Sequence, residues 1–330
     1  MTPAGGAAGA GSFRPGAPSG AGSSRPGRGI RFALIAMACF AVQDGTSKHL
    51  GTHYPPEFFI MVRYWLFAAF VAVIAARRAG GLRVAARTRM PLLQSFRGVL
   101  LAVQIIVMTT SFVWIGLAET HAVFALHPLL ATLIAVPLLG ERIGWRRAGA
   151  IGVGFLGVLV ILRPGLGVLR VEALLPLIAA AMMATYTVTT RMVSHADGSA
   201  APAFFYLGVA GAGALTLVGP FYWTPMAPVD WGWLALHSVV AMFGHYCLIA
   251  ALEATEAVRI QPFTYLQVVY AIIVGAVVFG ERIDLAMLAG MALVVGAGLY
   301  AIWREAHFAR RAALAPAGSR GHSAPGGGAG

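Results

Sequence analysis

Residues 128–143 read PLLATLIAVPLLGERI, an apolar run that ends in Gly-Glu-Arg-Ile. Such a run predicts a hydrophobic helix that closes at the four-residue ending. The same ending returns at residues 280–283 after a second apolar run, VVYAIIVGAVVF, 140 residues further along the chain. A repeat of that length covers nearly half of the 330 residues, so the chain is predicted to consist of two related halves.

The composition indicates that most of the chain lies in lipid. It is 58% hydrophobic and 11% charged, and a water-soluble globule could not hide so many apolar residues. A spanning helix needs about 20 apolar residues, whereas a β-barrel would show alternating segments of about ten residues, which the sequence lacks. We therefore predict an all-α polytopic membrane protein with ten transmembrane helices, at about 31–50, 57–76, 95–117, 119–139, 145–163, 172–192, 201–220, 231–252, 256–279 and 284–303.

The two ends of the chain predict disordered tails, at 1–29 and 309–330, because they are rich in Gly, Ala, Ser and Pro. The first could instead be an organellar transit peptide, but it lacks the apolar residues of an amphipathic helix. Cys39 and Cys247 both fall inside apolar spans, where they are expected to pack helices rather than form a disulfide. No metal site or cofactor is expected, since no His-Glu-x-x-His or Cys-x-x-Cys spacing occurs.

The net charge of +12 reflects membrane topology rather than nucleic-acid binding. Lys and Arg near short loops remain on the cytoplasmic side. With both termini cytoplasmic, most of these residues fall on that side, and the opposite side receives only Lys48, Arg163, Arg170 and Arg282. Five helices per half is an odd number, so the second half enters the membrane from the opposite side. The halves, 30–166 and 170–304, are therefore predicted to be inverted repeats, an architecture typical of secondary transporters.

Several stretches together resemble the EamA branch of the drug/metabolite transporter superfamily. They are the doubled ending at 140–143 and 280–283, Arg97-Gly98 opening the third helix, Pro128 in the fourth, and GFLGVLVILRPG closing the fifth. The resemblance covers about 31–303. It implies transport of amino-acid-, nucleoside- or vitamin-like solutes, and the first half is most similar to the carriers of S-adenosylmethionine and riboflavin.

Polar residues inside the spans are the candidates for the site, because ionisable groups in lipid usually face a cavity or a partner. In the first helix these are Gln43, Asp44 and Lys48, and the last two share a helix face. They either form a charged element of an outer gate, which binds a zwitterionic substrate or a coupling proton, or make a local ion pair. Asp44 is our first choice for a proton-linked group.

Arg63 lies deep in the second span. It could bind a substrate carboxylate or phosphate, or pair with Asp44 or Glu119 in a gate. Arg97, near the cytoplasmic end of the third span, is expected to extend to the lipid headgroups. His127 and His245 each either line the transport path or pack between helices.

The sixth and ninth spans contribute hydroxyl, amide and aromatic groups. Such groups in lipid usually join helices to one another. The tyrosines could also stack on a planar or cationic solute. The candidates are Tyr186, Tyr265, Gln267 and Tyr270.

The repeated ending is interpreted as a structural motif rather than a binding site. Each carboxylate, Glu141 or Glu281, follows a helix end and precedes an arginine, so it is expected to cap the next helix or pair across the turn. The motif residues are Gly140, Glu141, Arg142, Gly280, Glu281 and Arg282.

These observations predict a secondary transporter, not an enzyme, in a bacterial inner membrane. Its partners would be the bilayer, a small-molecule substrate, and a coupling proton or counter-solute, with no nucleic acid; the chain would be a monomer or homodimer. The alternatives are a membrane-embedded transferase, which should show acids or histidines clustered at one interface, and a non-transporting membrane partner, which should show an interaction tail. The sequence leaves the solute, the direction and the coupling ion open.

Overall fold

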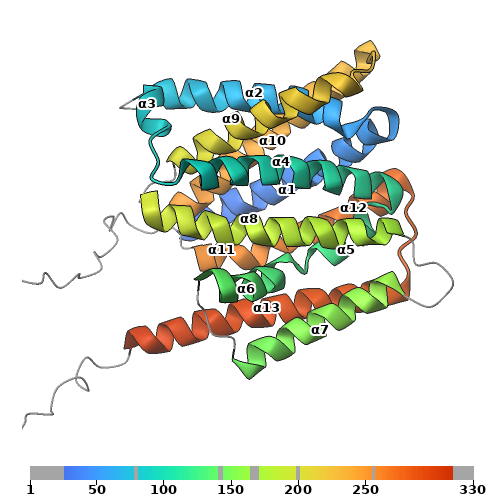
Figure 1. The fold of residues 1–330 in the computed structure, drawn as a ribbon. Coiled ribbons are helices and arrows are strands. Elements are labelled where there is room, and N and C mark those ends of the chain that lie inside the picture. The colour runs from blue at the N-terminus through green and yellow to red at the C-terminus, as the bar shows by residue number, and fades with distance from the viewer. Residues whose placement is uncertain are drawn as a thin grey trace, which may run out of the picture.

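Helices make up almost all of the part of the protein that the structure describes. The computed structural model describes residues 26–77, 81–139, 144–163, 171–197, 201–254 and 257–314, and these ranges contain no strand. Their helices run roughly side by side in one bundle (Figure 1). A chain in lipid must satisfy its backbone N–H and C=O groups internally, and an α-helix does so within one segment. The predicted all-α class is confirmed.

The helix bounds follow the apolar runs of the sequence. The first half contains α1 (Pro26–His53), α2 (Pro56–Arg77), a short α3 (Gly81–Ala85), α4 (Pro91–Trp114), α5 (Leu117–Phe124), α6 (His127–Leu139) and α7 (Trp145–Leu162). The second half contains η1 (Val171–Leu174), α8 (Leu175–Asp197), α9 (Ala201–Val218), η2 (Gly219–Tyr222), α10 (Pro228–Ala254), α11 (Ala257–Thr264), α12 (Leu266–Phe279) and α13 (Leu285–Leu314).

Six segments of the described chain are long and apolar enough to cross a membrane, so the protein is a multi-pass membrane protein. They are Pro56–Arg77, Pro91–Trp114, Leu117–Leu138, Pro202–Tyr222, Pro262–Phe279 and Leu285–Arg304. A shorter apolar helix covers Ala148–Leu162. The helix α1 is not among the six, because polar side chains interrupt its apolar sequence.

Two predicted spans are broken helices. The span at 119–139 is divided into α5 and α6, and the span at 256–279 is divided into α11 and α12. Proline has no N–H to donate and favours a break in the helix before it. Pro128 is the second residue of α6, and Pro262 lies in α11 shortly before the break at Tyr265. Short backbone hydrogen bonds close each break, such as Leu126 N–H to Val123 O at 3.1 Å.

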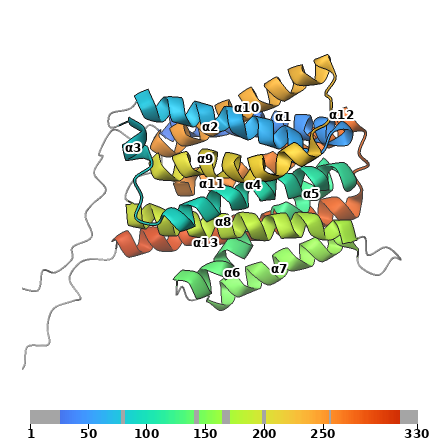
Figure 2. The same ribbon diagram turned by 45° about the horizontal axis from the view of Figure 1, so that its top comes forward.

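The outer limits of the bundle also differ from the predictions. The helix α1 begins at Pro26, and α13 continues to Leu314, so the last residues of one predicted tail and the first of the other are helical. The start of α1 and the end of α13 lie at the same end of the bundle (Figure 2). The first copy of the repeated ending, 140–143, lies outside the described residues.

The helices pack through both large and small residues. The helix α5 is enclosed: Leu117, Ala118, Ala122 and Val123 are at most 1% exposed. On the edge of the bundle α7 lies against α13 (Figure 2). There Gly157 and Gly290 meet, and a Cβ on either would lie 2.6 Å from the other's carbonyl oxygen. Small residues at such positions let membrane helices approach closely.

Candidate functional site

The polar residues of α1 lie inside the bundle. Asp44, Thr46 and Ser47 are buried, and Gln43 and Lys48 are half-buried. Successive residues on an α-helix point about 100° apart, so these side chains reach partners on several helices. We call residues 43–48 the α1 polar segment.

Asp44 connects the two broken helices. Its Oδ2 lies 3.0 Å from Nε2 of His121 on α5 and 2.8 Å from Nε2 of Gln267, the second residue of α12. Asp44 is 7% exposed and His121 is 2% exposed. A carboxylate and an imidazole in contact can hold a proton or pass it between them. The local ion pair between Asp44 and Lys48 that the sequence allowed is not formed, since each has a different partner.

His121 was not among the candidate site residues. His121 and His127 share one predicted span, but they are six residues apart and lie on different faces of a helix, so the sequence indicated no paired site. The useful signal was its position four residues before the break at Ala125, because transporters build their sites at broken helices. Its ring stacks on Phe112, with centroids 5.3 Å apart, which fixes the orientation toward Asp44.

Lys48 and Glu281 pair at the far end of α1. Lys48 Nζ donates to Glu281 Oε1, and the ammonium lies 4.6 Å from the centre of the Phe279 ring. The same carboxylate accepts the N–H groups of Leu117 at 2.7 Å and Ala118 at 2.9 Å. Glu281 therefore caps the N-terminus of α5, where exposed N–H groups and the helix dipole favour a negative charge.

Two glycines make room for the Glu281 carboxylate. A Cβ on Gly275 would lie 2.5 Å from Oε2, and one on Gly116 would lie 3.0 Å from Cδ. Gly116 also has a φ of +102°, a backbone conformation that residues other than glycine rarely adopt. The Glu281 carboxylate thus lies between the backbones of Gly116 and Gly275.

The prediction that Glu281 caps the following helix is wrong. Asp284 caps α13, because its Oδ1 accepts the N–H of Met287 at 2.8 Å. The hydrogen bond from Arg163, followed by that from Met287, lowers the pKa of Asp284. Gly280 ends α12 with a φ of +64°, and Arg282 is exposed. Glu281 is thereby free to reach across to α5.

Arg63 forms a second cluster on the other side of α1. It is 6% exposed, and its guanidinium lies 3.4 Å from Gln43 Oε1 and 3.5 Å from His237 Nε2. His237 Nδ1 lies 3.2 Å from the Gln43 carbonyl oxygen, which can only accept. Nδ1 therefore carries the proton, and Nε2 presents a lone pair to Arg63.

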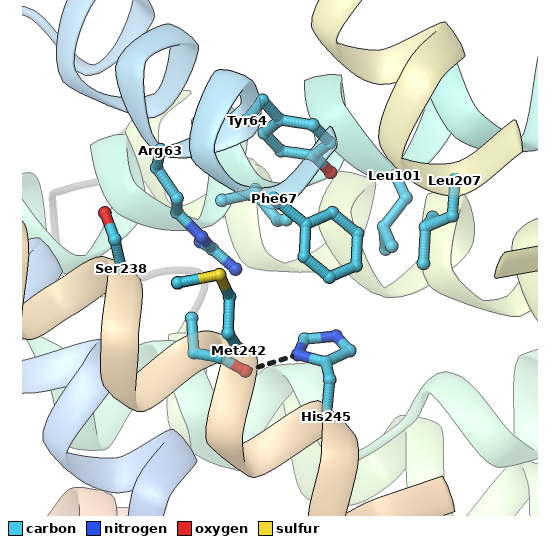
Figure 3. Close-up of a pocket in the computed structure, with 10 residues that line it drawn as sticks. Arg63, Tyr64, Phe67, Leu101, Leu207, Ser238, Met242 and His245 are labelled. Carbon is cyan, nitrogen blue, oxygen red and sulfur yellow. Dashed lines mark hydrogen bonds between the residues drawn. The ribbon is translucent and has the colours of Figure 1, made fainter. Parts of the chain in front are cut away.

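A small cavity lies beside Arg63 (Figure 3). Arg63 enters it from α2 and His245 from α10, and Phe67, Leu101 and Leu207 provide an apolar wall. The free volume is about 10 Å³, which is room for one water molecule. His245 Nδ1 lies 2.8 Å from the Ala241 carbonyl oxygen, which can only accept, so Nδ1 carries the proton. The other ring nitrogen, Nε2, is then free to accept a hydrogen bond. The two predicted candidates Arg63 and His245 thus share one cavity.

A third polar network joins α4 to α8. Arg97 is 1% exposed, so the expectation that it extends to the lipid headgroups is wrong. It donates to Thr190 Oγ1 at 2.9 Å and to Gln94 Oε1, and its guanidinium lies 4.9 Å from the centre of the Tyr186 ring. Tyr186, a predicted candidate, is therefore a partner of Arg97.

Asp197 extends this network to the loop before α4. Burial raises the pKa of Asp197, but hydrogen bonds from Thr88, the Arg89 N–H and Gln94 outweigh it, and the net shift is downward. The three donors lie 2.6, 2.8 and 2.9 Å from the carboxylate oxygens. This contact was not predictable from the sequence, because it joins residues about a hundred positions apart.

The remaining candidates are not among the residues that line the cavity beside Arg63. His127 contacts the Phe124 carbonyl oxygen at 3.1 Å and stacks on its ring. Tyr270 packs beside Cys247. The Tyr265 hydroxyl fills the space beside Gly298 and has no hydrogen-bond partner within the described ranges. The same part of the chain holds no group of three or more His, Cys, Asp or Glu that could bind a metal ion.

Comparison with known proteins identifies the family. The model of the EamA-like transporter family matches twice, at 27–163 and 170–303. The S-adenosylmethionine uptake transporter of Rickettsia prowazekii (strain Madrid E) is 26% identical over 280 residues, covering 84% of this chain and 93% of the relative. The riboflavin transporter of Brucella anthropi is 26% identical, covering 77% and 91%.

The pseudopaline exporter of Pseudomonas aeruginosa (strain UCBPP-PA14) is 25% identical, covering 81% of this chain and 93% of that one. A solved crystal structure of a protein 18% identical in sequence has the same fold, with a TM-score of 0.57 over 87% of this chain and 99% of its own. All three named relatives are transporters rather than enzymes. The two family matches cover most of the chain, and it belongs to the EamA-like transporter family.

Proposed function

We propose that the chain is a ten-helix secondary transporter that moves a small organic metabolite by alternating access. The ten spans would be α1, α2, α4, α5 with α6, and α7 in the first repeat, and α8, α9, α10, α11 with α12, and α13 in the second. The repeats, 30–166 and 170–304, would rock against each other around a central site. Family membership and the named relatives favour transport over the transferase and the non-transporting partner.

Helix packing supports the inverted repeat. A two-fold relation between the halves makes α8 equivalent to α1, α4 to α10, and α6 to α12. Each contact that involves one half should then recur with the equivalent helices exchanged. The contact of α1 with α10 recurs as that of α8 with α4. The contact of α1 with α12 recurs as that of α8 with α6. Equivalent helices near the axis should pack on each other, as α2 does on α9 and α7 on α13.

The single observation that carries the proposal is the meeting of both broken helices at Asp44. His121 comes from the broken helix of the first half and Gln267 from that of the second. A change in the relative position of the halves would alter both contacts at once. Binding or release of a proton at Asp44 and His121 can therefore be coupled to that change.

We further propose that the chain lies in a bacterial inner membrane with both termini in the cytoplasm. The excess of Lys and Arg predicted for that side supports this orientation. It also agrees with the start of α1 and the end of α13, which lie at the same end of the bundle (Figure 1). Lys48 and Glu281 then lie toward the outside. Their pair would form the outer gate, closed in this conformation.

The test is uptake and exchange by the purified full chain in proteoliposomes. S-adenosylmethionine, riboflavin, amino acids and nucleosides are screened with imposed proton or sodium gradients, against empty liposomes. The proposal expects saturable flux or exchange of at least one solute above the empty control. Absence of flux and exchange for every solute under both gradients would contradict it.

A further inference from the structure

Arg63 is a buried cation whose contacts are all neutral. It is 6% exposed and contacts an amide oxygen and an imidazole nitrogen, both at distances near the limit for hydrogen bonds. A guanidinium has five N–H donors, so two long contacts leave most of its capacity unused. No ion pair joins Arg63 to any carboxylate of the described residues. The charge of Asp44 acts on Arg63 only from a distance, without direct contact. A buried charge with no carboxylate in contact is costly, which makes Arg63 a candidate for binding a group from outside the chain.

The other buried arginine provides a comparison. Arg97 donates hydrogen bonds to an amide oxygen and a hydroxyl and lies over an aromatic ring, as expected of a structural residue. Asp44 is the acid whose charge acts on Arg63, yet its carboxylate contacts His121 and Gln267 instead. Arg63 thus retains its charge for a group that is not part of the described chain.

The cavity beside Arg63 defines the chemistry of that group (Figure 3). Arg63 is the one charged side chain among its lining residues, so the site balances a single negative charge. A planar carboxylate matches the fork of a guanidinium with two parallel hydrogen bonds. Beside Arg63, Phe67 and Leu101 offer an apolar surface, and His245 adds a polar edge.

We propose that Arg63 binds the carboxylate of the transported solute, and that the solute is a small monocarboxylate with an apolar or aromatic body. This rests on the proposed function and names the substrate class of its site. The cavity now admits about one water molecule, so the solute enters only when α2 and α10 move apart. The present conformation is the contracted state of the site.

The test uses matched pairs of solutes that differ in the carboxylate. Phenylalanine is paired with phenylalaninamide, and S-adenosylmethionine with its decarboxylated analogue; flux, competition and thermal stabilisation of the full chain in detergent are measured. A charge-assisted hydrogen bond predicts that the acids are preferred by about tenfold or more. R63Q should lose the preference, R63K should keep part of it, and R97Q and R31Q, at a buried and an exposed arginine, should retain it.

The outcomes separate this inference from the proposed function. Equal affinity for acids and amides in the wild type, or an undiminished preference in R63Q, overturns the inference while transport stands. If no solute is transported, thermal stabilisation by acids but not amides still supports the Arg63 site. If R63Q does not fold, the R63K variant provides the test. A lysine cannot make the two parallel hydrogen bonds of a guanidinium, so an acid preference in R63K equal to that of the wild type would overturn the inference. A preference for flavin mononucleotide over riboflavin without one for carboxylates would assign the site to phosphate and overturn the proposal.

Discussion

The Glu281 carboxylate lies 2.7 Å from the backbone nitrogen of Leu117, which precedes it by 164 residues. One side chain thereby completes the N-terminus of α5 and neutralises Lys48 of α1. Three helices of the bundle, α1, α5 and α12, are thus joined at a single carboxylate. From the sequence, this residue was expected to act only within its own turn.

Replacing Glu281 with Ala should lower the free energy of unfolding by about 1–3 kcal/mol, because two backbone donors and Lys48 lose their partner. Glu281→Gln should cost less, since one amide oxygen still accepts. Thermal unfolding in detergent measures both, with Arg282→Gln, at an exposed neighbour, as the control. Equal stability of the Ala variant and the wild type would show that the cap is dispensable.

Lys48 and Glu281 should be energetically coupled. A double-mutant cycle with Lys48→Met and Glu281→Gln is expected to give an interaction energy of about 0.5–3 kcal/mol, since the pair is largely shielded from water. If the pair closes the outer gate, each single variant should also raise the exchange rate of a transported solute. Additive effects on stability would indicate that the two side chains do not interact.

Asp44→Asn should remove the response of uptake to an imposed pH gradient, because an amide cannot take up the proton shared with His121. Solute exchange without a gradient should persist. Uptake in proteoliposomes at several pH gradients measures both, and Glu172→Gln outside the site serves as control. A pH response in Asp44→Asn equal to that of the wild type would exclude Asp44 as the coupling group.

Gly157→Ala should destabilise the protein by about 1–3 kcal/mol, because the added methyl would meet the backbone of α13. Gly152→Ala on the same helix has no atom within 4 Å of its Cβ and should be neutral or slightly stabilising. Thermal unfolding of the two variants under the same conditions compares them. A Gly157 variant as stable as the Gly152 variant would contradict the close approach of α7 and α13.

The contact of Asp197 with the loop before α4 should depend on pH. Its pKa is lowered below the ordinary value of 3.8, so its stabilising contribution is complete above that value and is lost as the pH falls through the lowered pKa. The difference in melting temperature between the wild type and Asp197→Asn should therefore shrink as the pH drops from 6 toward 3. A difference that stays constant over this range would show that the carboxylate charge is not involved.

The helical class was predictable because lipid leaves few choices for an apolar chain, and the repeated ending predicted two related halves. The breaks at Ala125 and Tyr265 were harder to see. Pro128 and Pro262 marked their neighbourhoods, yet apolar residues continue on both sides, so hydropathy gave one span in each case.

The individual polar residues of the site were predictable as a set, but their partners were not. Asp44 and Lys48 share a helix face, which suggested a pair, whereas the fold offers each a better partner from a distant segment. Arg97 appeared to lie near a helix end, yet α8 covers it fully. Contacts of this kind depend on how helices are arranged in space, and one sequence contains no measure of that.

The Glu281 cap makes the two segments matched by the family model depend on each other. Leu117 belongs to the first segment matched by the family model and Glu281 to the second. A first segment made alone would carry an unfinished helix end and an unpaired lysine, and a second segment alone would carry a carboxylate without its donors. Neither segment is complete at this point without the other, so this contact ties the two matched segments together.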